Sequence, residues 1–367
     1  MRRTVRRYLC GAGAATAAVV AGLVGCALLL LAPGTLTAFF TPAVDSCTVF
    51  AVKQRDTVYL GNNEDYPYAE SAYWVDPGEE GEYDVLYFGL DDLRPRGGVN
   101  EKGLCYDATG LPEALLNRHY ELTPLKIHFP ILALRRCTTV EEVIALAQSY
   151  DWGRHMRYQA LFADATGDAV VISPGFDGEL AFTRKSEGNA YLIATNFNLG
   201  EKYYGEYPCE RYDTAAVMLE ETKTDTDLTV ELCRDVLAAV EQSEAAAYTL
   251  YSTITDPVEG LVYVYYLRQF DSGIVLDVAE LLETGEAAYS MRALFPVSLV
   301  TRAEAAIPEE PVDVRSHVAT ALLIAAAAVA VARIESVERG KHSRGRPAPR
   351  RWLRVLALRS ALLRGQQ

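Results

Sequence analysis

The sequence predicts an α+β fold in which strands and helices stack as layers. Many short runs rich in Tyr, Val and Ile alternate apolar and polar residues, which is the period of a half-buried β-strand. Fewer segments repeat their apolar residues at helical spacing, and these form groups of their own. Grouped strands and grouped helices are typical of α+β sandwiches. No Pro-rich or Gly-rich linker divides residues 47–300, so we expect a single domain there.

The predicted strands begin with two hairpins. Residues 47–54 and 56–63 alternate in hydrophobicity and are separated by a short charged turn. Residues 158–174 form a second hairpin, which turns at Thr166-Gly167-Asp168. Further strands are expected in segments that are rich in aromatic and β-branched residues: 190–196, 248–255, 260–269 and 273–278.

The clearest helices are predicted between these strands and after them. One begins at a capping box formed by Thr138 and Glu141. The apolar residues of this helix lie on one face: Val140, Val143, Ile144 and Ala147. Residues 211–221 and 228–242 also carry apolar residues at helical spacing. Such helices need a sheet against which to bury their apolar faces.

Charge divides the chain into an acidic body and two basic ends. The formal net charge is −14, but residues 1–46 carry about +3 and residues 333–367 about +8, which leaves about −25 for the body. Phosphate binding needs a basic surface, so we expect no nucleic-acid partner. Basic ends around an acidic body favour a membrane location instead.

Both ends have the composition of membrane-type segments. Residues 1–46 start with a positive stretch, and no charge occurs from Tyr8 to Ala32, which indicates an export signal or N-terminal propeptide that is removed. At the other end, a spacer (301–315) precedes an Ala-rich segment (316–334), the expected transmembrane anchor, and a basic cytoplasmic tail (335–367). We therefore expect an exported protein, membrane-anchored with its globular domain outside the cytoplasm. A secreted protein is the alternative.

Cys47 stands directly after the removable segment and opens the first predicted strand. Cleavage before it would place a new α-amine beside its thiol, and the pKa of about 7.7–8.0 of such an amine suits a general base. Signal peptidase acting after Ser46, or self-cleavage at the same bond, would produce this end, and the sequence leaves both routes open. There is no C-x-x-C pair and no H-E-x-x-H, so neither a metal nor another cofactor is expected.

Four sequence blocks occur in order. They are Cys47-Thr48 followed by G-N-N-E-D-Y (61–66), then G-G-V-N-E-K-G-L (97–104), then Ala194-Thr195-Asn196, then Glu210-Arg211-Tyr212. In these blocks the chain resembles the choloylglycine hydrolase and penicillin V acylase group of N-terminal-nucleophile hydrolases, which includes acyl-CoA:6-aminopenicillanic acid acyltransferases. The likeness covers residues 47–285 in outline. It implies a four-layer αββα sandwich, with the membrane-type segments at its two ends.

The resemblance implies a nucleophilic site around Cys47. Cys47 would attack an amide carbonyl while its own α-amine takes and returns the proton. Asp65 would hold the amine or the thiol by a hydrogen bond, and Arg211 would steady the charged region around the nucleophile. The structural alternatives are a turn carboxylate for Asp65 and a surface salt bridge for Arg211. Asn100 and Glu101 would shape the loop of the second block.

The resemblance also implies a site for the oxyanion. Asn196 would donate its side-chain amide, unless it only completes a turn, and the backbone N–H of Gly110 would be the second donor. Most of the family has arginine beside the nucleophile where this chain has Asn62, which offers hydrogen bonds but no charge. The substrate class is therefore left open, and bile salts and penicillin V are not assumed as substrates.

The implied activity is hydrolysis of a linear carbon–nitrogen amide bond, in a small N-acyl amide or amino-acid conjugate, through a thioester on Cys47. An acyltransferase on the same fold remains open. So does a catalytically silent, membrane-tethered binding protein, which the missing charge at Asn62 favours. A conventional thiol hydrolase would instead pair Cys47 or Cys105 with His128 or His155, but neither histidine lies in a recognisable motif.

Overall fold

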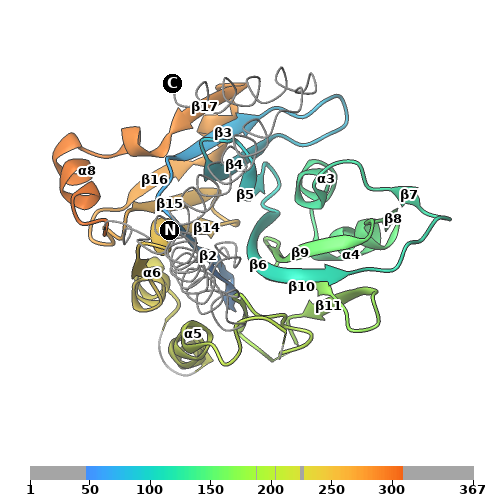
Figure 1. The fold of residues 1–367 in the computed structure, drawn as a ribbon. Helices are drawn as coiled ribbons and strands as arrows, with labels where there is room; N and C mark the ends of the chain where they lie inside the picture. The colour runs from blue at the N-terminus through green and yellow to red at the C-terminus, as the bar shows by residue number, and fades with distance from the viewer. Residues whose placement is uncertain (1–46, 187, 203, 224–226, 309–367) are drawn as a thin grey trace, which may run out of the picture. The chain divides into compact units, whose positions relative to one another are not determined.

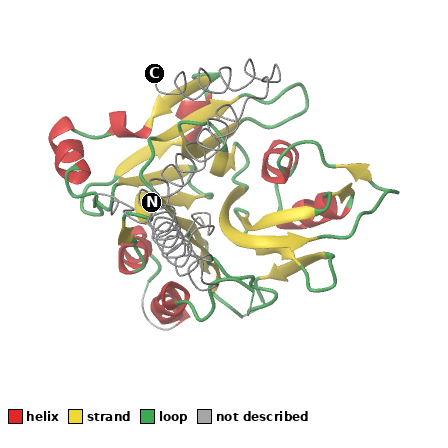
Figure 2. Cartoon of the chain, viewed as in Figure 1, coloured by secondary structure: helices red, strands yellow, loops and turns green. Residues whose placement is uncertain are grey.

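Two antiparallel sheets form the centre of the fold (Figures 1 and 2). The computed structural model describes residues 47–308, apart from 187, 203 and 224–226, and this part belongs to one compact unit. The predicted signal segment, transmembrane anchor and basic tail lie outside the described residues. Among the residues that are described, no helix is long and apolar enough to cross a membrane.

The first sheet, sheet A, contains the predicted first hairpin. Its strands in the described residues follow one another in this order: β12 (Tyr191–Ala194), β1 (Thr48–Gln54), β2 (Thr57–Tyr66), β14 (Ala247–Asp256), β15 (Leu261–Tyr266) and β16 (Ile274–Asp277), with β13 (Ser243–Glu244) beside β14. Every pairing is antiparallel. The strands predicted in this part of the sequence are confirmed.

The second sheet, sheet B, contains the predicted second hairpin and several strands that the sequence did not reveal. Its order is β11 (Leu180–Arg184), β10 (Ala169–Pro174), β9 (His155–Ala163), β6 (Cys105–Leu115), β5 (Pro95–Asn100), β4 (Val85–Leu90), β3 (Ser71–Asp76) and β17 (Ala287–Ser290). A short parallel pair, β7 (Thr123–Pro124) and β8 (Tyr150–Asp151), lies outside both sheets.

Helices cover the outer surface of each sheet (Figure 1). On sheet B, α3 (Phe129–Arg136) and α4 (Val140–Gln148) bury apolar side chains against Tyr87 and Phe162. On sheet A, α5 (Glu210–Glu220), which continues into the short η2 (Glu221–Lys223), and α6 (Val230–Ala239) do the same against Phe50. Each fully buried side chain of this size stabilises the fold by about 1.5–3 kcal/mol.

A third apolar cluster lies between the two sheets. It joins Val49 and Leu60 of sheet A to Leu86 and Leu161 of sheet B. Three further elements contribute buried residues to the same cluster: α7 (Val278–Leu282), η3 (Met291–Leu294) and α8 (Val297–Glu304). The predicted α+β class is confirmed. The predicted domain boundary after residue 300 stays a prediction; α8 runs across this position and buries Ala303.

The predicted capping box of α4 is wrong by one residue. Thr139, not Thr138, is the N-cap: its hydroxyl accepts from the backbone N–H of Glu142, whose carboxylate accepts from the N-cap backbone. Thr138 adds a hydroxyl contact of 3.0 Å to the same carboxylate. Both Thr–Glu pairs have the required spacing, and the extended backbone of Thr139 decides between them.

The turn of the N-E-K-G-L block is held by Asn100, as predicted. Its amide donates to the carbonyls of Leu134 (2.7 Å) and Cys137 (2.8 Å) in and after α3. Gly103 takes a φ of +81°, and a Cβ at this position would lie 2.5 Å from the carbonyl oxygen of Pro257. Glycine is therefore required here both by conformation and by space.

Candidate active site

Cys47 directly precedes β1, which lies between β12 and β2 in sheet A. Cys47 is only 1% exposed to solvent. Hairpin pairing sets Thr48 opposite Asn63, which brings Cys47 beside Glu64. The thiol donates to Glu64 Oε2 over 3.7 Å, a normal length for a sulfur donor. The sequence therefore places a carboxyl group directly against the predicted nucleophile.

Arg211 connects most of the other predicted residues. It is the second residue of α5, which packs beside β12 and β1 on the outer face of sheet A. Its Nη1 donates to the Cys47 carbonyl oxygen (2.7 Å) and to the Thr48 hydroxyl (2.9 Å). Its Nη2 donates to Asn196 Oδ1 over 2.8 Å. A guanidinium suits this position because its fixed fork serves several acceptors at once.

Asp65 is completely buried beside this cation. Its Oδ1 accepts a 2.5 Å hydrogen bond from the Thr249 hydroxyl, and its Oδ2 lies 4.0 Å from Arg211 Nη1 without a hydrogen bond. Burial raises the pKa of Asp65 well above its ordinary value, whereas the Thr249 hydrogen bond and the Arg211 charge act to lower it. An ammonium group next to Oδ2 would stabilise the ionised carboxylate in this place.

Asn196 and Gly110, the predicted oxyanion donors, lie in contact. Asn196 follows β12, and its Nδ2 donates to the carbonyl oxygen of Gly110 over 3.1 Å. The preceding residue, Thr195, is held by sheet B, because its carbonyl oxygen accepts from Thr109 Oγ1 (2.6 Å) and Gln159 Nε2 (2.7 Å). These bonds fix the end of β12 against β6 and β9, and so determine where the Asn196 amide lies. The roles assigned to both residues stay predictions.

Asn62 lies on the opposite face of β2 from Asp65. Side chains alternate along a strand, so Asn62 and Glu64 face sheet B with Leu60, while Asp65 faces the helices. Asn62 is fully buried, and neither its amide nitrogen nor its amide oxygen has a hydrogen-bond partner. The structure thus separates the predicted residues into two sets, on the two faces of one strand.

The site contains polar groups that the sequence analysis did not single out. Between the sheets, Glu64 raises the pKa values of Asp107 and Tyr251 beyond what burial alone does, and Arg96 lowers both. Gly97 makes room for one of these groups, since a Cβ there would lie 2.3 Å from Asp107 Oδ2. Glu64 was within reach of prediction, because it lies in the first block at strand spacing from Asn62. Asp107, Tyr251 and Arg96 lie near Glu64 only because strands that are distant in the sequence come together in the fold.

The alternative pairing of Cys105 with His155 does not form. Cys105 pairs with Ala163 and donates to its carbonyl oxygen, whereas His155 pairs with Leu115 at the far end of β6. Ten residues of strand separate the two ends, which is about 33 Å. The other histidine of this hypothesis, His128, packs on the Tyr158 ring, and burial lowers its pKa to about 4.

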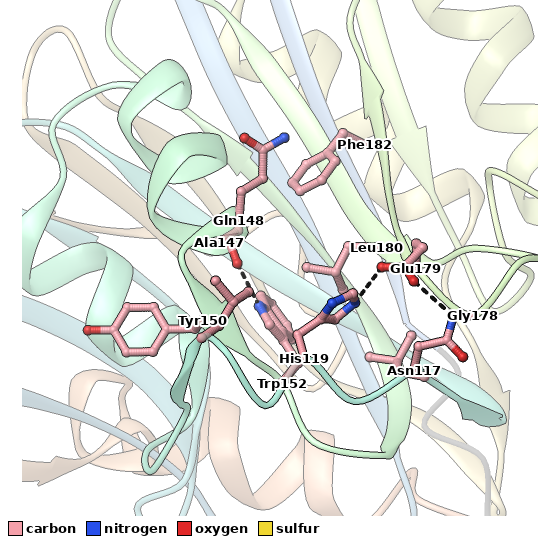
Figure 3. A pocket seen from close by; sticks show the side chains of 12 residues that line it. Asn117, His119, Ala147, Gln148, Tyr150, Trp152, Gly178, Glu179, Leu180 and Phe182 are labelled. Carbon is pink, nitrogen blue, oxygen red and sulfur yellow. Dashed lines mark hydrogen bonds and ion pairs between the residues drawn. The ribbon is translucent and has the colours of Figure 1, made fainter.

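A pocket elsewhere in the described residues contains none of the predicted site residues (Figure 3). It lies beside α4 and β11 and has a volume of about 350 Å³. Three of its polar groups are paired with one another: His119 lies 2.7 Å from Glu179, which also accepts from Asn117 over 2.8 Å. The described cysteines, Cys47 included, form no disulfide with one another.

Known structures share the two-sheet fold. Two variants of the conjugated bile acid hydrolase from Clostridium perfringens match with TM-scores of 0.53 and 0.52, at 16% identity, over 66% of this chain and 96% of each hydrolase chain. Penicillin V acylase from Agrobacterium tumefaciens matches with a TM-score of 0.50, at 15% identity, over 66% of this chain and 90% of the acylase. The fold is that of N-terminal-nucleophile hydrolases.

The sequence itself identifies the family within this class. The family described as acyl-coenzyme A:6-aminopenicillanic acid acyl-transferase matches residues 52–269, which is more than half of the chain. The chain belongs to this family, and the resemblance predicted from the four sequence blocks is confirmed. No curated protein matches the sequence.

Proposed function

We propose that the protein hydrolyses linear amide bonds in small N-acyl amides, with Cys47 as the N-terminal nucleophile. The observation that carries this proposal is the convergence on Arg211 of Cys47, Thr48 and Asn196, with Asp65 within 4.0 Å. The bile acid hydrolase and the penicillin V acylase are named for the cleavage of amides, and the family is named for acyl transfer to an amine. Amide chemistry is common to all three.

In the proposed reaction, removal of the segment before Cys47 creates its α-amine. The amine takes the thiol proton, and the thiolate attacks the amide carbonyl. Asn196 and the Gly110 N–H stabilise the oxyanion. The proton then passes to the leaving amine as the carbon–nitrogen bond breaks, which leaves a thioester. Water, deprotonated by the same α-amine, hydrolyses the thioester and restores the thiol.

Asp65 has a distinct part in this proposal. Its buried Oδ2 lies on the side of β2 where Arg211 binds the Cys47 backbone, so it suits an α-ammonium group during the reaction. The negative charge would favour the protonated amine formed when the thiol is deprotonated. Asp65 would therefore act by positioning the base and stabilising its charged form.

The first experiment tests the nucleophile. Mature protein, whose N-terminus is verified as Cys-Thr-Val-Phe, should hydrolyse members of a panel of N-acyl amino acids, N-acyl amines and penicillins. Cys47→Ala should abolish this hydrolysis, and Cys47→Ser should be very poor because an alcohol is far less acidic than a thiol. Cys233→Ala is the control, since Cys233 belongs to α6 and is buried in the outer cluster, away from the site. Turnover by verified Cys47→Ala protein would overturn the mechanism.

The family name favours acyl transfer as a second candidate function. The same thioester could pass its acyl group to an amine instead of water. Mature protein given a thioester acyl donor, with and without an amine acceptor, should distinguish the two: a transferase forms the amide faster than it releases the free acid. A thiol-directed activity probe distinguishes both enzymes from a silent binding protein. In an active enzyme the probe labels Cys47 in the mature protein but not in the unprocessed chain, whereas a silent binding protein shows no such difference.

We also propose that the enzyme is exported and anchored with its catalytic domain outside the cytoplasm. The basis is the sequence of residues 1–46 and 316–367 alone. Protease added outside intact cells should digest the body and spare the basic tail. An active enzyme that still begins at Met1 would contradict the maturation step, and a full-length chain recovered entirely in the soluble fraction would contradict the anchor.

A further inference from the structure

Two fully buried, uncharged side chains on the inner face of sheet A near Cys47 have polar atoms without hydrogen bonds. Both polar atoms of the Asn62 amide lack a partner, and so does the Tyr251 hydroxyl. Buried polar groups are otherwise nearly always hydrogen-bonded, because burying them unpaired is costly. Groups that stay unpaired beside a nucleophile are suited to bind a substrate.

Both side chains lie on the same face of sheet A as the thiol, the face toward sheet B. Asn62 pairs with Val49, and Val49, like Leu60, belongs to the cluster between the sheets. Cys47 precedes Val49 by two residues and therefore faces the same way. Tyr251 belongs to this cluster too, and the charges of Glu64 and Cys47 both act on it to raise its pKa.

The charges around this space disfavour an anion. Glu64 Oε2 lies 3.7 Å from the thiol, and the Glu64 charge reaches Asp107, which is also fully buried. The neighbouring cation, Arg96, already acts on Asp107, and Arg211 serves the other face of β2. A carboxylate on the substrate would thus meet two carboxyl groups and a cation that already interacts with one of them.

A carboxamide, in contrast, matches the unpaired atoms. Its N–H can donate to Asn62 Oδ1, and its carbonyl oxygen can accept from Asn62 Nδ2, which gives a reciprocal amide pair. The Tyr251 hydroxyl can donate a second hydrogen bond to the carbonyl oxygen of the substrate carboxamide. None of these contacts needs a charge on the substrate.

We propose that Asn62 and Tyr251 form a specificity subsite for an uncharged carboxamide beside the scissile bond. Its preferred substrates are N-acylated aminoacyl amides rather than N-acylated free amino acids. The proposal rests on amide hydrolysis at Cys47. It adds the chemical class of the leaving amine, which the family does not determine.

The test compares two substrates that differ only in this group: N-octanoylglycinamide and N-octanoylglycine, repeated with phenylacetyl and palmitoyl groups. Mature enzyme should cleave the glycinamide with kcat/KM roughly tenfold or more above that for the glycine conjugate. Tyr251→Phe, which removes only a hydroxyl, should reduce this preference severalfold. Asn62→Leu should abolish it, and Asn62→Arg should reverse it by supplying a cation for the carboxylate. Asn117→Leu, in the separate pocket of Figure 3, should leave it unchanged.

Binding to mature Cys47→Ala protein, measured by calorimetry with the same pairs, separates the two proposals. Tighter binding of the glycinamide without any turnover by the parent enzyme would contradict the hydrolase and support the subsite. Equal binding, or tighter binding of the glycine conjugate, would overturn the subsite whether or not the parent turns over. Retention of the full preference by both Asn62→Leu and Tyr251→Phe would overturn it as well.

Discussion

Asn62 and Asn63 are neighbours on β2, and both are fully buried, but their hydrogen bonding differs. Asn63 faces the helices: its amide donates to the Leu237 carbonyl oxygen in α6 over 2.9 Å and accepts from the Ser252 hydroxyl over 2.6 Å. Asn62 faces sheet B, and its amide has no partner. Asn63 thus connects the strand to α6 and β14, whereas the polar atoms of Asn62 remain available to a ligand.

The comparison extends to the groups around each asparagine. On the outer face, Arg211 and Thr249 give Asp65 and the Cys47 backbone their partners. On the inner face, Glu64 contacts the thiol, and the unpaired hydroxyl of Tyr251 lies among apolar side chains. In the proposed reaction, the outer groups hold the site in place and the inner groups contact the substrate. Substitutions on the two faces should therefore have different consequences.

Removing Arg211 should have the largest effect on the outer face. Arg211→Ala leaves the Cys47 carbonyl oxygen, Asn196 Oδ1 and the buried Asp65 without their cation. We expect a loss of about 3 kcal/mol or more in the free energy of unfolding, together with loss of activity. Arg211→Lys should recover part of the stability, because it keeps the charge but not the fork. Urea denaturation measures both. A loss below about 1 kcal/mol for the alanine variant would show that the outer face does not depend on this residue.

Asn196 joins the two faces, and its substitution should affect the rate more than the fold. Removing one oxyanion donor typically lowers kcat by about 10²–10³-fold. Asn196→Asp keeps an acceptor for Arg211 Nη2 but cannot donate to an oxyanion, so it should lose as much kcat as Asn196→Ala. Single-turnover and steady-state kinetics measure the loss. A decrease below about threefold in both variants would assign Asn196 to structure alone.

The sequence predicted the sheet hairpins and named residues that the structure brings close together, but not how they divide between the two faces of β2. Cys47, Asp65 and Arg211 were found because they lie in short blocks with fixed spacing. The hairpin of β1 and β2 follows from local alternation, and it brings Glu64 to the thiol. Strand alternation in the G-N-N-E-D block would have shown that Asn62 and Asp65 point apart.

Other features could not be predicted, because they depend on contacts between distant segments. Thr249 and Tyr251 reach β2 only through the β2–β14 register, which shifts at a bulge between them. Asp107 enters the space between the sheets because Gly97 on the neighbouring strand leaves room for its carboxylate. The strands β3 to β6 were missed: β3 and β4 are buried along almost their whole length and so show no alternation, and glycine and polar residues in β5 and β6 weaken the pattern.

The contrast between the two asparagines can be measured directly with a matched pair of variants. Asn63→Leu leaves the Leu237 carbonyl oxygen and the Ser252 hydroxyl without this partner, so it should lower the free energy of unfolding by about 1–3 kcal/mol. Asn62→Leu buries a similar volume and breaks no hydrogen bond in the protein, so its effect on stability should lie within about 0.5 kcal/mol or be favourable. If denaturant unfolding shows the same loss of free energy of unfolding for Asn63→Leu and Asn62→Leu, the two asparagines do not differ in their structural role.

The smallest expected effect concerns Asp107 on the inner face, where ionisation of a buried carboxyl group is costly. Burial raises the pKa of Asp107 well above its ordinary value, and the charge of Glu64 raises it further, against the backbone N–H of Ala108 and the Arg96 cation. The folded protein therefore keeps this proton at pH values where the unfolded chain has lost it. The resulting contribution to stability is fully present below the ordinary pKa of an aspartic acid and is lost as the pH rises through the folded-state pKa.

Asp107→Asn has no proton to lose, so its melting temperature relative to the parent should increase between pH 4 and pH 8. Asp235→Asn, whose side chain is 55% exposed, is the control and should show no such trend. If the melting temperatures of the parent and Asp107→Asn differ by the same amount at every pH in this range, ionisation of Asp107 does not destabilise the folded protein.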